Sequence, residues 1–140
     1  MVDAPPTFVD TNVLANAHDR SETAKPVARA LLETLWQDRA GVVSTQVLQE
    51  LYVVTTRKLD PPMPRGAARE LVALYATWPV VQVDVPLVLA ASALEERHTL
   101  WFWDALVLEA ARRAGATRLV TEDLQPGRRV GGVMIENPFA

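Results

Sequence analysis

Short apolar runs alternate with longer stretches of helical periodicity along almost the whole chain. Between residues 22 and 39, for example, apolar side chains recur at the spacing of one helix face, at Val27, Leu31, Leu32 and Leu35. Similar spacing predicts helices that begin near residue 13 and that cover 22–39, 45–59, 65–77, 86–98 and 103–114. Apolar runs too short for a helix predict strands over 7–10, 42–43, 80–84, 117–121 and 133–135. This order is typical of an α/β fold in which helices cover a mainly parallel sheet of four or five strands.

Polar residues and prolines mark the expected ends of these elements. Thr11 and Asn12 offer capping oxygens to the first helix, and Ser44 offers one to the helix over 45–59. The proline-rich segment 60–64 is too short for a domain linker, so it predicts a loop between two helices.

The composition indicates a chain that folds around one core. Of the 140 residues, 49% are hydrophobic and 22% are charged, and the mean hydropathy is +0.06, which excludes disorder driven by low hydrophobicity. This length is usual for one domain, so residues 1–140 are expected to form a single one. The absence of cysteine excludes disulfides and thiolate metal sites.

No segment indicates a membrane span or an export signal. The longest stretch without a charge or a strong helix breaker covers residues 87–94, far fewer than the roughly 20 apolar residues that span a bilayer. The first residues lack both the basic start and the apolar run of a secretory signal. A cytoplasmic location with no membrane partner is therefore expected.

The charge balance argues against a broad basic surface for nucleic acid. The chain has 17 Asp and Glu residues against 14 Lys and Arg residues, for a formal charge of -3. If the protein binds a polyanion, a local source of positive charge is required.

Acidic side chains follow two of the predicted strands. Asp10 closes the first strand, and Glu122 and Asp123 directly follow the strand over 117–121. Because the carboxyl ends of parallel strands meet at one edge of a sheet, these side chains are expected at a common edge. The alternative is that each one caps the helix or turn that follows it, which is a common role for aspartate.

Two further carboxylates lie within predicted helices. Glu50 is too deep in its helix for a first-turn role, and Gln46, Glu50 and Arg57 share a face that would by itself be a solvated polar stripe. Asp104 lies about 180° around its helix from the exposed Arg113, so it points away from solvent. An inward carboxylate is costly unless hydrogen bonds, a cation or a metal neutralise it. The alternative is a first-turn aspartate that backbone N–H groups satisfy.

If Asp10, Glu50, Asp104 and Asp123 converge, their mutual repulsion requires a counter-charge. Oxygen ligands without cysteine favour Mg²⁺ or Mn²⁺ over zinc. The two histidines, His18 and His98, lie in unrelated sequence contexts and are not needed as ligands. Such a metal would also make a net-negative site attractive to phosphate.

Four sequence blocks, in this order, resemble the motifs of PIN-domain ribonucleases. They are FVDTNVL at residues 8–14, STQVLQEL at 44–51, FWDAL at 102–106 and TEDL at 121–124. Each block alone is weakly specific, but four in the right order across nearly the whole chain are strongly so. The compact length is most similar to that of VapC-type toxins of toxin–antitoxin pairs.

The resemblance implies a three-layer α/β/α fold and an endoribonuclease that depends on Mg²⁺ or Mn²⁺. In such enzymes, water activated by one or two ions attacks the phosphodiester in line. The implied acidic quartet, catalytic and metal-binding, consists of Asp10, Glu50, Asp104 and Asp123. The implied polar support comes from Thr11, Asn12, Thr121 and Glu122, with Glu122 also an alternative to Asp123 as the fourth acid. The implied partners are RNA, a cognate antitoxin and a second copy of the chain.

Some residues of the substrate surface are left open by the resemblance. Trp101 stands where the family often has a small hydroxyl residue, and it is either an obstacle to the polar lining or a stacking surface for a base. Arg128 and Arg129 are the nearest candidates in sequence for contacts to RNA phosphates, followed by Arg20 and Arg57. Each of them is otherwise an ordinary solvated arginine. Single-stranded or looped RNA is the expected target, because proteins reach unstacked bases.

Two other functions fit part of the pattern. Aspartyl-phosphate proteins, either response-regulator receivers or haloacid-dehalogenase-like phosphatases, also place an aspartate after the first strand. The phosphatases need a second aspartate where this chain has Asn12, and both groups use a late lysine, whereas Lys25 and Lys58 fall early in this chain. A catalytically inactive PIN-like module that binds RNA or protein is the non-enzymatic alternative. Such a module would have no physical reason to keep four clustered carboxylates.

Overall fold

A six-stranded sheet forms the centre of the protein. The computed structural model describes residues 4–21 and 25–140. The strands are β1 (Thr7–Val9), β2 (Gly41–Ser44), β3 (Val80–Val81), β4 (Arg118–Val120), β5 (Arg129–Val130) and β6 (Val133–Glu136). Their order across the sheet is β3-β2-β1-β4-β6-β5, and every neighbouring pair is parallel except β5 and β6. The predicted α/β class with a mainly parallel sheet is confirmed.

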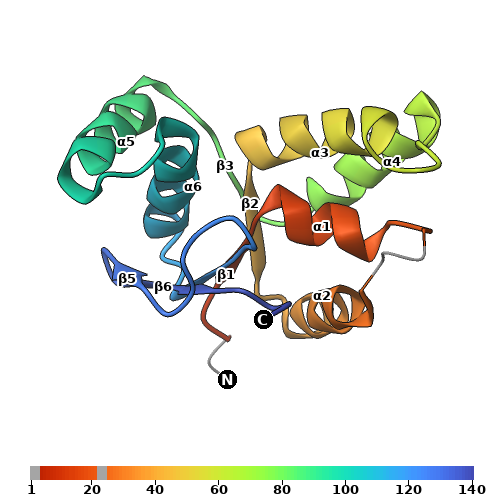
Figure 1. Cartoon of the computed structure of the whole chain (residues 1–140), viewed down its shortest axis with the longest axis horizontal. Helices are drawn as coiled ribbons and strands as arrows, with labels where there is room; N and C mark the ends of the chain where they lie inside the picture. Colours follow the sequence, from red (N-terminus) through yellow and green to blue (C-terminus); the bar gives the residue numbers. More distant parts are fainter. Residues whose placement is uncertain (1–3, 22–24) are drawn as a thin grey trace.

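Helices cover both faces of this sheet. They are α1 (Thr11–Ala17), α2 (Pro26–Asp38), α3 (Thr45–Arg57), α4 (Arg65–Tyr75), α5 (Val85–His98) and α6 (Phe102–Arg113). Figure 1 shows α5 and α6 on one side of the strands and α1 to α4 on the other, which gives the expected three layers. Within the described residues, no helix is both long enough and apolar enough to cross a membrane.

The register of the central strands brings several strand ends to one edge of the sheet. Strand β1 lies between β2 and β4, and Val9 pairs with Val120. The Asp10 N–H continues this ladder by donating to the Val120 carbonyl at 3.0 Å. Because β1, β2 and β4 run in the same direction, Asp10, Ser44 and Thr121 lie at a common edge, where α1 and α3 also begin.

The central strands are buried on both faces, as parallel strands between two helical layers require. Phe8, Val9 and Val43 expose no surface, and Leu51 and Leu108 of the flanking helices are equally buried in the same core. The side chain that follows β1 is therefore anchored by a strand that is packed on every side.

Two local predictions were wrong. The residue that caps α1 is Asp10, whose carboxylate accepts a hydrogen bond from the Thr11 N–H at 2.8 Å, instead of Thr11 or Asn12. The predicted strand over 80–84 ends at Val81, because Asp84 caps α5 by accepting from the Leu87 N–H at 3.0 Å. A short polar side chain that follows a strand can cap the next helix by accepting a hydrogen bond from its backbone. In α1 this cap lies earlier in the chain than the sequence pattern predicts.

The sixth strand, β5, is absent from the sequence prediction because a two-residue strand has no measurable alternation. It forms because Gly131 and Gly132, with φ of 55° and 83°, make a two-residue turn that pairs Val130 with Val133. Glycine adopts positive φ values at little conformational cost, which explains why both residues of this turn are glycines.

The other predicted boundaries agree to within a few residues. Ser44 caps α3 as expected, since its hydroxyl accepts from the Val47 N–H at 3.2 Å. The helix predicted over 22–39 corresponds to α2, which begins at Pro26, and residues 22–24 lie outside the described residues.

Gly41 begins β2 against a cluster of aromatic rings. A Cβ atom at this position would lie 2.6 Å from three ring atoms of Trp78. Trp78 in turn packs against Tyr75 at 5.0 Å and against Trp36 at 4.9 Å between ring centroids. The ring next to Gly41 therefore has little room to move.

Gly41→Ala is expected to destabilise the fold by roughly 1–3 kcal/mol, because the indole must shift within a packed cluster. Gly66→Ala in α4 is the matched control, since nothing lies within 4 Å of the added Cβ atom. Helix propensity predicts that this control is neutral or stabilising by up to about 1 kcal/mol. Urea unfolding followed by circular dichroism measures both changes, and equal stability of the two variants would contradict the packing argument.

Candidate active site

Asp10 is the most buried carboxylate of the site, with 6% of its surface exposed. One carboxylate oxygen accepts from the Thr11 N–H and the other from the Thr121 hydroxyl, each at 2.8 Å. Burial raises the pKa of Asp10 to about 6, against the lowering effect of these two hydrogen bonds, and the charges of Glu50 and Asp123 raise it further. No basic side chain of the described residues forms an ion pair with it. Asp10 is thus a fixed carboxylate without a counter-charge.

Glu50 reaches the same region from α3. Its carboxylate accepts from the Thr11 hydroxyl at 3.1 Å and from the Gln46 amide at 3.1 Å. Thr11 therefore contacts two acids at once, since its backbone binds Asp10 and its hydroxyl binds Glu50. Because Thr11 belongs to α1 and Glu50 to α3, a shift of one helix against the other would change the distance between the Asp10 and Glu50 carboxylates.

Asp104 lies in the first turn of α6 and is half-buried, whereas Arg112 and Arg113 at the other end of the helix are exposed. Burial is the main cause that raises the pKa of Asp104, and the charges of Asp123 and Glu50 add to it. These electrostatic effects mean that α6, α3 and the loop after β4 bring their acids near one another.

The two acids after β4 have different partners. Glu122 pairs with Lys25 at 3.9 Å, and its N–H donates to the Asn12 amide oxygen at 3.3 Å. Asp123 is exposed, and its charge acts on both Asp10 and Asp104. Asp123, unlike Glu122, is therefore unpaired among the described ion pairs and acts electrostatically on two other acids of the site.

Thr121 connects several parts of this site through one hydroxyl group. The hydroxyl donates to Asp10 at 2.8 Å and accepts from the Asn12 amide at 3.3 Å and from the Asp123 N–H at 3.1 Å. A threonine hydroxyl has one hydrogen and two lone pairs, so all of its capacity is used. Thr121 has no exposed surface, which makes it a rigid support for Asp10.

Gln46 is a member of the site that the sequence prediction missed. The pattern assigns it to a solvated stripe of α3, but the side chain is buried. Its amide nitrogen donates to Glu50 and, at 3.4 Å, to the Trp103 carbonyl of α6, 57 residues away in sequence. Its amide oxygen is buried and has no hydrogen-bond partner among the described residues. The only available signal was the spacing of four residues between Gln46 and Glu50, which places them on adjacent turns of one helix face.

The arginines that the sequence proposes for substrate contacts differ in their exposure and in their neighbours. Arg128 is half-buried and donates to the His98 carbonyl at 3.3 Å, close to the end of α5. Arg129 lies on β5 and is exposed. Arg20 lines a cavity of about 590 Å³ beside His18, Met63 and α4, and none of the four acids lines this cavity.

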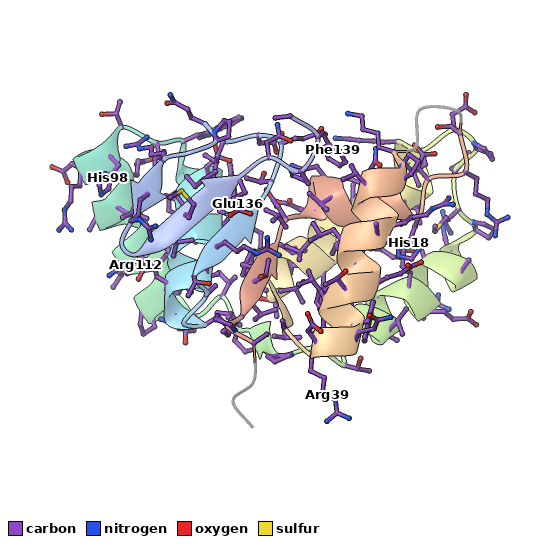
Figure 2. The ribbon with its side chains drawn as sticks, turned by 90° about the horizontal axis from the view of Figure 1, so that it is seen from below. His18, Arg39, His98, Arg112, Glu136 and Phe139 are labelled. Atoms are coloured by element: carbon purple, nitrogen blue, oxygen red, sulfur yellow. The ribbon has the colours of Figure 1, made fainter. Side chains whose placement is uncertain are left out.

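The cluster fits a hard divalent cation by its donor type and its charge. The four acids supply only oxygen donors and have no ion-pair partner among the described residues. The charges of Glu50 and Asp123 help to raise the pKa of Asp10 and of Asp104. The side chains are not arranged as a finished cage, because no three acids or histidines in residues 4–21 and 25–140 are grouped to ligate one ion. His18 bonds to the Tyr75 hydroxyl at 2.7 Å, and Figure 2 shows His18 and His98 on opposite sides of the molecule.

The raised pKa of Asp10 predicts a pH-dependent stability in metal-free buffer. The folded pKa of about 6 exceeds the unfolded value of 3.8, so the folded state binds more protons between these values and stability falls as the pH rises through them. The loss is expected to reach up to about 3 kcal/mol by pH 7.5. Asp10→Asn is expected to remove most of this dependence, measured by urea unfolding from pH 4 to 7.5 with EDTA.

The control for this experiment is Asp38→Asn, which changes an exposed acid at the end of α2 and is expected to keep the wild-type dependence. An unchanged pH dependence in Asp10→Asn would show that Asp10 is not the uncompensated group.

The fold and the site can be placed among known proteins. The PIN-domain profile matches residues 7–131. No curated protein sequence matches the chain. A toxin–antitoxin complex from Klebsiella pneumoniae is similar, with a TM-score of 0.70 and 18% identity over 94% of this chain and 97% of that one.

Two further solved structures share the fold. The Mycobacterium tuberculosis toxin VapC20, which cleaves the sarcin–ricin loop, has a TM-score of 0.63 and 22% identity over 81% of this chain and 86% of that one. DNA-bound VapBC from Salmonella typhimurium has a TM-score of 0.64 and 18% identity over 96% and 99%. With the profile match over most of its length, the chain belongs to the PIN-domain family.

Proposed function

We propose that this protein is a metal-dependent endoribonuclease and the toxin of a toxin–antitoxin pair. The observation that carries the proposal is the buried Asp10 carboxylate, which has no basic partner among the described residues and lies within the electrostatic reach of Glu50 and Asp123. A charged group kept in this way destabilises a fold unless a cation compensates it. Membership in a family of nucleases and the toxin folds of the similar structures support the same function.

The acids that would hold Mg²⁺ or Mn²⁺ are Asp10, Glu50, Asp104 and Asp123. When bound, the ion supplies Lewis-acid activation of water and compensates the charge of the phosphate. In the hydrolysis, the water oxygen bonds to phosphorus and the bond to the 3′ oxygen breaks, which leaves a 5′-phosphate and a 3′-hydroxyl.

The chain's own polar groups orient these acids. The Thr11 N–H and the Thr121 hydroxyl hold the two oxygens of Asp10, and Gln46 holds Glu50 against α6. Asn12 extends this support, because its amide nitrogen donates to Thr121 and its amide oxygen accepts from Glu122. Groups that are held by several hydrogen bonds need little rearrangement when the substrate arrives.

The proposed substrate is single-stranded or looped RNA, with Arg128 and Arg129 as candidate contacts for its phosphates. The proposed protein partners are a second copy of the chain and an antitoxin. The cavity beside His18 and Met63 has a mostly apolar lining, which suits an apolar segment of such an antitoxin. An antitoxin that also places a cation over the acids would neutralise them and exclude the metal.

RNA cleavage with Mg²⁺ or Mn²⁺ is expected to stop with EDTA and to fall by roughly 100-fold or more in Asp10→Ala and Asp104→Asn, because each change removes charge from the cluster. Asp38→Asn is the control and is expected to keep full activity. Denaturing gels measure the rate, and end-group analysis is expected to find 5′-phosphates. Cleavage at equal rates by all variants, or 2′,3′-cyclic phosphate products, would contradict the proposal.

The toxin assignment is checked with the same variants in cells. Expression of the wild type is expected to arrest growth, whereas expression of Asp10→Ala is not. Co-expression of a small protein whose gene lies beside the gene of this chain is expected to restore growth. No arrest by an active nuclease would remove the toxin assignment and leave the nuclease assignment.

Metal binding has a readout that does not depend on activity. Mn²⁺ at a concentration 100-fold above its dissociation constant is expected to stabilise the folded wild type by about 2.7 kcal/mol. Asp10→Asn is expected to lose most of this gain at pH 7.5, and Asp38→Asn none of it. Thermal unfolding with and without Mn²⁺ measures the change, and equal gains in all three proteins would indicate a site elsewhere.

A further inference from the structure

Trp101 is a large apolar side chain that exposes 72% of its surface. It is the N-cap residue of α6, with φ of -67° and ψ of 142°, and its side chain makes no capping hydrogen bond. Serine, threonine, aspartate and asparagine are preferred at this position because their oxygens satisfy the free N–H groups of the first turn. A large apolar ring in water and a missing cap are both unfavourable, and such local conflicts are typical of functional positions.

The position of Trp101 relates it directly to the acidic cluster. It precedes Asp104 by three residues, and the Ala105 N–H donates to the Trp101 carbonyl at 2.9 Å, so the first turn of α6 is closed. Residues three apart on a helix lie next to each other on one face. The Gln46 amide donates both to Glu50 and to the Trp103 carbonyl, so the first turn of α6, with Trp101 at its N-cap position, lies beside Glu50 at the rim of the site.

The neighbouring tryptophan is placed differently. Trp103 lies one residue before Asp104, about 100° around the helix. Its ring packs edge-to-face against Phe102, at 5.5 Å between centroids. Trp101 is therefore the more exposed of the two indoles and the one on the face of Asp104.

Trp101 is separate from the exposed apolar face of α5. That face consists of Val85, Val88 and Leu89, in the first half of the helix. The ion pair of Arg113 with Asp84, at 2.9 Å, joins the end of α6 to the start of α5, so the two helices are antiparallel. The apolar face and Trp101 thus lie toward opposite ends of a pair of helices about 20 Å long.

A basic group comes close to the chain just before Trp101. The guanidinium of Arg128 donates to the carbonyl of His98, three residues before Trp101. An aromatic ring and a guanidinium beside an acidic cluster suit a nucleotide, whose base stacks on the ring and whose phosphate attracts the cation. The polar groups beside the ring, the Asp104 carboxylate and the Arg128 guanidinium, favour a nucleotide over a purely apolar protein segment as the occupant.

We propose that Trp101 stacks on an unpaired base next to the bond that is cleaved and so selects single-stranded RNA. This inference rests on the proposed nuclease function and names the part of the substrate that the site recognises. Because every base has a flat face, the contact tolerates different sequences but requires an unstacked base.

Trp101→Ser is the decisive variant, because stability and binding are expected to change in opposite directions. The serine adds an N-cap and removes an exposed indole, so the thermal midpoint is expected to rise by about 2–5 °C. The dissociation constant for a single-stranded oligoadenylate decamer is expected to rise roughly 5- to 100-fold. Fluorescence anisotropy with Ca²⁺ in place of Mg²⁺ measures binding, and gels confirm that the decamer stays intact.

Three comparisons isolate stacking from other effects. An abasic decamer of equal length is expected to bind wild type and Trp101→Ser equally. Trp101→Phe is expected to recover most of the affinity, because it restores an aromatic face. Leu89→Ala, which removes an apolar side chain that is 66% exposed on α5, is expected to bind like the wild type.

The outcomes separate this inference from the proposed function. A chain that cleaves RNA but binds the decamer equally with tryptophan or serine at position 101, or whose wild type does not bind it, would overturn the stacking role alone. A change in oligomeric mass of Trp101→Ser with unchanged affinity would also overturn it and assign the indole to a protein contact. Absence of metal-dependent cleavage would instead remove the proposed function.

Discussion

The carboxylate of Asp10 is buried at the junction of β1 and α1, and the organisation of the site depends on how it is held there. Its two oxygens accept from the Thr11 N–H and the Thr121 hydroxyl, so both lone-pair directions that face the protein are used. These hydrogen bonds favour the ionised form, yet burial has the larger effect and raises the pKa to about 6. The fold therefore keeps an unfavourable charge at the edge of its sheet, which a bound cation would stabilise.

A small number of polar side chains connects this carboxylate to the rest of the site. Thr11 joins Asp10 to Glu50, and Gln46 joins Glu50 to the backbone of α6. Thr121 joins Asp10 to the loop that carries Asp123. Each link crosses between two elements, so a shift of one helix changes the spacing of the acids. The close packing of the core therefore helps to fix the distances between the acids of the site.

The proposed function requires an acidic chain to act on a polyanion, and the distribution of charge is compatible with this. Four of its acids lie around one edge of the sheet, and Glu122 is already paired with Lys25. The same lysine lies over the ring of Phe139, at 4.4 Å from its centroid, and Figure 2 shows Phe139 and Arg39 at opposite ends of α2. The start of α2 and the contact with Phe139 thus support the loop after β4. The excess of acids behind the net charge of -3 includes the four acids of the proposed metal site.

Much of this arrangement follows from the sequence alone. The alternation of apolar runs and helical periodicity determined the parallel sheet, and the position of Asp10 and Asp123 directly after strands determined the edge at which they lie, because parallel strands end together. The order of the four motif blocks identified the family. Boundaries set by single side chains, such as the end of β3 before the Asp84 cap of α5, and the two-residue strand β5 were beyond the pattern, because they depend on one hydrogen bond or one turn.

The tertiary structure decided which side chains are buried and which acids are paired. Gln46 belongs to a polar stripe by its spacing, but α6 covers it and supplies the Trp103 carbonyl as its partner. Glu122 and Asp123 are adjacent in sequence, but the fold pairs Glu122 with Lys25, nearly a hundred residues earlier, and leaves Asp123 to act on Asp10 and Asp104. Periodicity reports the local environment of a residue, whereas desolvation and charge pairing depend on neighbours that the fold brings from far along the chain.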